Sequence, residues 1–146
     1  MAEARPAWAN WGLIGLVFVG GSLGTATRAA LALAIDPTDG FPATVMAINV
    51  AGALLLGALL EALSRRGADE GARRRIRLLT GTGFLGGFTT YSALATDSVV
   101  LAAGSPALAL LNALGTLVLG ALATWLGIVL AARGDRGRAH RVRAHR

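Results

Sequence analysis

The sequence has no cysteine and no lysine, and charged residues of any kind are few. The lack of cysteine excludes a disulfide scaffold, a thiolate metal site and a cysteine nucleophile. Charged residues make up 15% of the 146 residues, whereas soluble domains carry about 25%. Hydrophobic residues make up 54%, and the mean hydropathy is +0.59. This composition argues against a soluble fold and indicates one small membrane domain.

The apolar residues fall into four long blocks separated by short polar breaks. These blocks span residues 11–35, 41–64, 76–103 and 106–132. Each exceeds the roughly 20 residues that a helix needs to cross a bilayer. A cleaved signal peptide fails for the first block, because three further spans follow and only Arg5, against Glu3, precedes it. The sequence predicts a four-helix membrane domain over residues 1–132 and a basic cytoplasmic tail over 133–146.

The arginines are distributed very unevenly along the chain. One precedes the first block, six surround the link between the second and third blocks, and six lie in the C-terminal tail. They are Arg5; Arg65, Arg66, Arg73, Arg74, Arg75 and Arg77; and Arg133, Arg136, Arg138, Arg141, Arg143 and Arg146. The opposite side carries only Asp36 and Asp39. The positive-inside rule therefore predicts a multi-pass cell-membrane protein with both termini cytoplasmic, and the tail favours anionic lipid over nucleic acid.

Two glycine patterns imitate the motifs of soluble enzymes. Residues 81–86 read G-x-G-x-x-G, but the strand, helix and acidic residue of a dinucleotide-binding turn are missing. Residues 20–24 read G-x-S-x-G, but both histidines lie in the tail, far from a nucleophilic Ser22. Packing is the stronger interpretation, because Gly20 with Gly24, and Gly83 with Gly87, form small-residue seams for close helix contact.

The third block has the most unusual composition. From Thr80 to Ser92 it reads TGTGFLGGFTTYS, with four glycines and five serine or threonine hydroxyls. Each interior glycine costs a helix about 1 kcal/mol relative to alanine, and the whole block is longer than a bilayer needs. We predict a break at Gly86–Gly87 near the midplane, where the free carbonyls and N–H groups of two half-helices can bind ions. A loose continuous helix is the alternative.

Polar residues also interrupt the other blocks. Arg28 lies inside the first block, where a central arginine costs about 2.5–3.5 kcal/mol, unless it reaches an interface. Asn49 is the only amide of the second block. Its side chain either contacts a permeating solute or makes an interhelical hydrogen bond. Asn112, Thr116 and Gly120 share one helical stripe, which is either a polar track or a packing seam.

Hydrogen-bond donors dominate among these polar groups, and Asp97 is the acidic exception. The donors are Arg28, Asn49, Thr89, Thr90, Tyr91, Ser92, Asn112 and Thr116. A route lined by donors suits an anion, so the residues predict a small anion channel or carrier. A multidrug carrier is disfavoured, because its proton coupling needs an embedded acid and Asp97 lies near a helix end.

Three motifs resemble the Fluc/CrcB family of fluoride channels over nearly the whole chain. The family patterns are G-x-x-G-A-x-x-R, N-x-x-G and G-G-x-T-T-F-S-T-F. They read GSLGTATR at residues 21–28, NVAG at 49–52 and GGFTTYSAL at 86–94. The order and spacing of all three agree with the family.

The resemblance implies an antiparallel dimer with two fluoride pores and passive export of fluoride, without enzyme chemistry. It also implies a structural sodium ion at the dimer centre, bound by the backbone carbonyls of Gly86 and Thr89. The fluoride pathway that it implies comprises Arg28, Asn49, Thr90, Tyr91, Ser92, Leu94, Asn112 and Thr116. The acid that follows the break is Asp97, where the family usually has glutamate.

The chain departs from the family at several of these positions. Tyr91 and Leu94 replace a pair of phenylalanines whose positive ring edges face an anion. Val45 replaces a threonine, and Ala29 replaces a tyrosine. A homodimer of antiparallel subunits also needs balanced charge, which this chain lacks. We therefore expect an oppositely oriented paralogue as partner. The alternative function is a weakly conducting or non-conducting subunit that completes the partner's pore.

Overall fold

The computed structural model describes the backbone of residues 10–35 and 41–144 and the side chains of 10–35 and 41–134. Its elements are α1 (Trp11–Ala34), α2 (Ala43–Ser64), α3 (Gly71–Ile76), the π-helix η3 (Arg77–Leu85), α4 (Gly86–Phe88), α5 (Tyr91–Gly104) and α6 (Pro106–Ala144). Within these ranges there is no strand, which confirms the prediction of an all-α protein.

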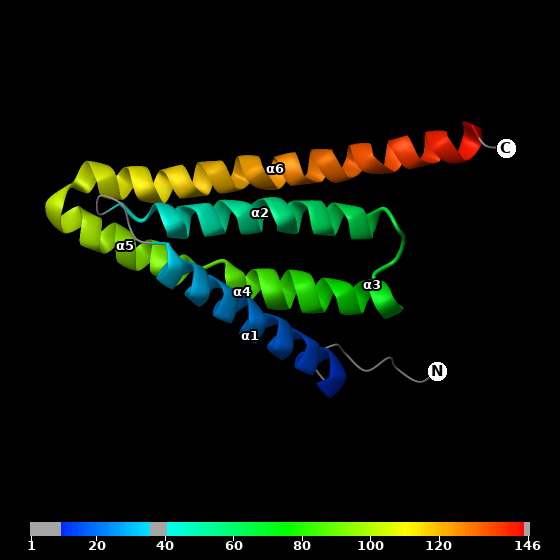
Figure 1. The fold of residues 1–146 in the computed structure, drawn as a ribbon, viewed down its shortest axis with the longest axis horizontal. Helices are drawn as coiled ribbons and strands as arrows, with labels where there is room; N and C mark the ends of the chain where they lie inside the picture. Colours follow the sequence, from blue (N-terminus) through cyan, green and yellow to red (C-terminus); the bar gives the residue numbers. More distant parts are fainter. Residues whose placement is uncertain (1–9, 36–40, 145–146) are drawn as a thin grey trace.

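The helices form an elongated bundle in which α6 lies alongside α2, and α1 crosses η3 and α4 (Figure 1). Among the described residues, three segments are long and apolar enough to cross a membrane: α1, α2 and residues Pro106–Gly134 of α6. The third predicted span, residues 76–103, consists of the end of α3 followed by η3, α4 and α5. The described residues are therefore those of a membrane protein with three uninterrupted spans and one bent span.

The predicted tail is not separated from the last span by a helix end. Helix α6 continues through residue 144, whereas its apolar run ends at Ala132, just before Arg133. Its C-terminal end therefore projects beyond α2 (Figure 1). The start of α1, the α2–α3 connection and the C-terminal end of α6 lie at the same end of the bundle.

Helix α1 packs directly on the backbone of η3 and α4 through glycine. A Cβ atom at Gly24 would overlap the Phe84 carbonyl oxygen, and one at Gly87 would overlap the carbonyl of Gly21. Gly20 and Gly83 meet in the same crossing. This confirms the predicted small-residue seams, and it explains how a glycine-rich segment retains tight packing. An equivalent seam joins α2 and α6 at Gly57 and Gly127.

The break in the third span lies at Thr89–Thr90, not at the predicted Gly86–Gly87. Gly86 to Phe88 remain helical, and both threonines are extended, with φ and ψ of −77° and 155° at Thr89 and −149° and 122° at Thr90. The glycines stay helical because Gly87 packs against α1. Thr90 ends the segment because its hydroxyl accepts a hydrogen bond from Ala93 N–H at 3.2 Å and so caps α5.

Candidate functional site

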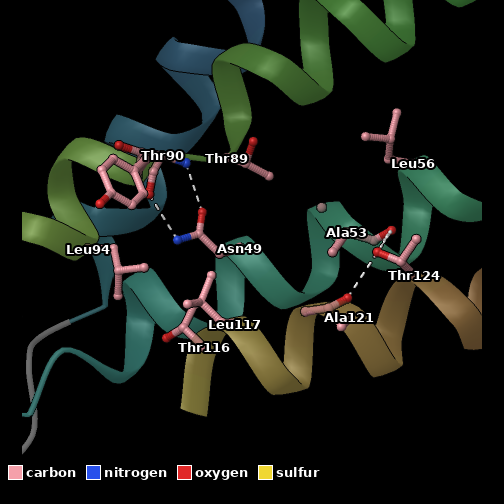
Figure 2. A pocket seen from close by; sticks show the side chains of 13 residues that line it. Asn49, Ala53, Leu56, Thr89, Thr90, Leu94, Thr116, Leu117, Ala121 and Thr124 are labelled. Atoms are coloured by element: carbon pink, nitrogen blue, oxygen red, sulfur yellow. Dashed lines mark hydrogen bonds between the residues drawn. The ribbon is translucent and has the colours of Figure 1, made fainter. Parts of the chain in front are cut away.

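Asn49 holds the break by pairing with the backbone of Thr90. Its Nδ2 donates to the Thr90 carbonyl at 3.0 Å, and its Oδ1 accepts from the Thr90 N–H at 2.8 Å (Figure 2). Both peptide groups lack a helical partner, because Thr90 is extended between α4 and α5. Of the two alternatives left open by the sequence, the structure shows the interhelical hydrogen bond. One Nδ2 hydrogen of Asn49 remains for another acceptor.

A cavity of about 390 Å³ lies between α2, the break and α6 (Figure 2). It is lined by Asn49, Gly52, Ala53, Leu56, Thr89, Thr90, Tyr91, Leu94, Thr116, Leu117, Gly120, Ala121 and Thr124. No carboxylate is among these residues. The polar groups are hydroxyls and an amide, and both can donate hydrogen bonds. The structure thus brings together most of the predicted pathway residues in a groove without negative charge.

The polar stripe on α6 is buried and packs against α2 and α5. Asn112 is 1% exposed and Thr116 is 5% exposed. Asn112 Nδ2 donates to Ser98 Oγ at 3.0 Å, and Ser98 in turn donates to the Leu94 carbonyl at 2.8 Å. Asn112 Oδ1 and Thr116 Oγ1 are buried without a partner among the described residues. Gly120 packs against Ala53 of α2.

Two polar residues of this region were missed by the sequence analysis. Thr124 lines the cavity, and its hydroxyl donates to the Gly120 carbonyl at 2.9 Å. It continues the four-residue spacing of Thr116 and Gly120, which was a usable signal. Ser98 anchors Asn112, but no sequence spacing links residues on two different helices.

The side chains that follow the break differ in exposure and polarity. Leu94 is 6% exposed and forms part of the cavity wall, whereas Tyr91 is 79% exposed at its edge. The Ser92 hydroxyl lies 3.1 Å from the Thr90 hydroxyl. The ring edge available to the cavity is therefore that of Tyr91, because Leu94 presents only methyl groups.

Arg28 lies apart from this cavity. Its Nε donates to the Gly87 carbonyl at 3.4 Å, and Thr25, one helical turn earlier, donates to the same oxygen at 3.3 Å. The C-terminal end of a helix carries partial negative charge, so a cation is favourable there. In this structure Arg28 binds the end of α4.

The carbonyls near the break have different partners. The Leu85 carbonyl accepts the N–H and hydroxyl of Thr89 at 3.0 and 2.9 Å, and the Gly87 carbonyl accepts Thr25 and Arg28. Among the described residues, no such capping donor reaches the carbonyls of Gly86 and Thr89. These oxygens fit the predicted role of cation ligands, because carbonyls freed at a helix break can coordinate Na⁺.

Asp97 lines a second cavity of about 390 Å³, which lies near the last turn of α1 and the first turn of α2. That cavity also contains Thr44 and Val45, and Asp97 Oδ2 is buried without a partner among the described residues. The structure therefore separates Asp97 from the groove that holds Asn49.

Comparison with known proteins identifies the family. The profile described as "CrcB-like protein, Camphor Resistance (CrcB)" matches residues 15–128. A "Fluoride-specific ion channel FluC 2" of Leifsonia xyli subsp. xyli is 50% identical over 118 residues, covering 80% of this chain and 81% of that protein. One of the same name from Bacillus subtilis is 40% identical over 117 residues, covering 80% and 86%.

A "Fluoride-specific ion channel FluC 1" of Cutibacterium acnes is 53% identical over 87 residues, covering 59% of this chain and 61% of that protein. The family profile covers most of the chain, including the break and the polar stripe of α6. The chain therefore belongs to the CrcB family.

Proposed function

We propose that this chain is a subunit of a fluoride-specific channel that passes F⁻ passively out of the cell. The relatives named as fluoride channels support this function, and an ion channel needs no enzyme chemistry. The observation that carries the proposal is the cavity at the break, which contains hydroxyls and an amide but no carboxylate. HF enters a cell and dissociates, so a fluoride pathway lowers cytoplasmic fluoride under a negative-inside potential.

Hydrogen-bond donors replace the water that fluoride loses in this pathway. Thr116 provides a buried hydroxyl without a partner among the described residues, and Thr90 and Ser92 provide hydroxyls at the break. Asn49 keeps one free Nδ2 hydrogen beside them. Burying an ion is very costly unless polar groups compensate for lost hydration. An anion gains these donors along the groove, whereas a cation finds no carboxylate there.

The proposed cofactor is a structural sodium ion held by the carbonyls of Gly86 and Thr89. Their lack of capping donors supports this role. Gly86 is exposed on this chain, which supports a position where a second subunit can approach it. The ion would fix the two breaks to one another and would not itself be transported.

The proposed assembly is an antiparallel dimer in the cell membrane, with an oppositely oriented paralogue as partner and with both termini of this chain in the cytoplasm. The arginine distribution supports a single orientation. The alternative function is a weakly conducting or non-conducting subunit that completes the partner's pore. Leu94 in the cavity wall favours that alternative, because it presents neither a ring edge nor a donor.

The test is fluoride efflux from proteoliposomes that contain the purified chain alone. The measurement is repeated with chloride in place of fluoride and with sodium omitted on both sides. Fluoride-selective efflux that depends on sodium supports the channel and its sodium site. Efflux of both anions at the same rate contradicts fluoride specificity.

A second arm of the experiment contains the chain together with a paralogue whose arginine distribution predicts the opposite orientation in the membrane. Efflux from the mixture but not from either chain alone supports the paired assembly. Efflux from this chain alone contradicts the need for a partner. If folded protein gives no fluoride efflux in either arm, the channel function is contradicted.

A further inference from the structure

The connection between α2 and α3 is held in a defined shape. Arg73 Nε donates to the Ala68 carbonyl at 2.8 Å. Arg77 donates to both carboxylate oxygens of Asp69, with a shortest distance of 2.7 Å. Gly67 has a φ of 115°, a conformation that other residues rarely adopt. These bonds position arginines at one end of α2.

A cavity of about 280 Å³ lies where this connection meets the last turn of α2. It is lined by Leu60, Leu63, Ser64, Gly67, Asp69, Arg73 and Arg77. The leucines belong to the apolar span that ends at Ser64. The arginines belong to α3 and η3, which begin after the polar connection. One wall is therefore apolar and at the edge of the membrane span, and the other wall is basic.

The cavity carries positive charge in spite of Asp69. The hydrogen bond from Arg77 lowers the pKa of Asp69, so this carboxylate stays ionised at neutral pH and its charge is matched by its partner. Arg73 uses only its Nε in the bond to Ala68, so its two Nη groups keep their donors. Residues 61–77 contain six arginines against three carboxylates.

Neighbouring arginines increase this positive charge. In the described ranges the ion pairs are Arg65 with Glu61 and Arg77 with Asp69. Arg74 and Arg75 lie on α3 beside Arg73. The surroundings therefore attract an anion.

We propose that this cavity binds an acidic glycerophospholipid. The phosphate contacts the Nη groups of Arg73, which take no part in the bond to Ala68, and an acyl chain lies along Leu60 and Leu63. Arginine donors match phosphate oxygens well, and basic groups next to a membrane span attract anionic headgroups. The two leucines select a lipid over a free phosphate ion, because only a lipid has an apolar part to bury against them. This cavity shares no lining residue with the groove at the break, so the proposed lipid site is separate from the fluoride pathway.

The test measures lipid binding to the full chain in uncharged detergent micelles. Phosphatidylglycerol or phosphatidylcholine with identical acyl chains is added, and bound lipid is counted by native mass spectrometry. We expect phosphatidylglycerol to bind preferentially. R73Q is expected to weaken this binding by about five-fold, the loss for one arginine at a headgroup. R133Q removes the same charge from an exposed position on α6 and is expected to leave binding unchanged.

A second pair of variants tests the apolar wall without altering the loop. Leu60 is 42% exposed and Leu55, on the same helix, is 50% exposed, so neither is needed for the core. L60Q is expected to weaken phosphatidylglycerol binding, whereas L55Q, outside the cavity, is not. Thermal unfolding in phosphatidylcholine checks that each variant is folded.

Three results would overturn the proposal. Equal binding of the two lipids contradicts recognition of an acidic headgroup. Equal losses of lipid binding in R73Q and R133Q show a general attraction to positive charge and not a specific site in this cavity. Displacement of the lipid by excess inorganic phosphate, with L60Q unaffected, assigns the cavity to a free anion.

Discussion

Asn49 replaces the helical partners of Thr90 with its own side chain, through two hydrogen bonds of 2.8 and 3.0 Å across the gap between α2 and the break. The pair joins residues 41 positions apart. It leaves Thr90 extended while both of its peptide groups remain satisfied. The position of the break is therefore determined by α2 as much as by the third span.

Replacing Asn49 by alanine is expected to destabilise the protein and slow fluoride efflux. Two peptide groups of Thr90 lose their partners, and each unsatisfied group costs about 1–3 kcal/mol. N49D separates the two effects, because aspartate still accepts from the Thr90 N–H but places a carboxylate in the groove. N49D should recover part of the thermal stability while efflux stays low. Normal efflux in N49D would contradict a role of Asn49 in the anion pathway.

Two glycines of α1 offer a matched test of the helix crossing. A Cβ at Gly24 overlaps the Phe84 carbonyl, whereas one at Gly15 meets nothing within 4 Å. G24A should lower the free energy of unfolding by about 1–3 kcal/mol, the usual effect of overpacking. G15A should be neutral or slightly stabilising, because alanine favours the helix. Thermal unfolding in detergent measures both, and equal stability of the two variants contradicts the crossing.

Thr116→Val is expected to slow fluoride efflux without loss of stability. Its hydroxyl is buried and has no partner in the described part of the chain, so folding does not depend on a hydrogen bond from it. Removing one donor from the pathway is expected to lower the rate about ten-fold, corresponding to ~1.4 kcal/mol.

T124V serves as the control for that variant, because the Thr124 hydroxyl lines the same cavity but already donates to Gly120. Its efflux should be close to that of the unaltered chain. A similar decrease in T124V would indicate a general effect of cavity polarity, whereas unchanged efflux in T116V would exclude its hydroxyl from the pathway.

Leu94→Phe is expected to increase fluoride efflux by the chain alone. The substitution returns to the cavity wall a ring whose positive edge can face an anion. Proteoliposome efflux measures the change, and L117F provides the comparison, because Leu117 lines the same cavity from α6. No gain in L94F, with folding intact, contradicts the idea that Leu94 weakens this pore.

The sequence alone was sufficient for the features that depend on local chemistry. Four apolar blocks predicted a helical membrane protein because each exceeds the bilayer thickness, and the structure confirms this architecture. The Gly20–Gly24 and Gly83–Gly87 spacings predicted close packing, which the α1 crossing confirms. The three family motifs led to the family that the comparisons show.

Tertiary structure decided where these local tendencies take effect. Glycine content and block length predicted the break at Gly86–Gly87, but packing on α1 keeps those residues helical. The hydrogen bonds of Asn49 hold the break at Thr89–Thr90 instead. The grouping of Thr116 with Asn49, and the separation of Asp97 from both, likewise depend on how the helices pack. A sequence specifies which residues are polar or small, but their partners lie on other helices, and only the folded chain brings them together.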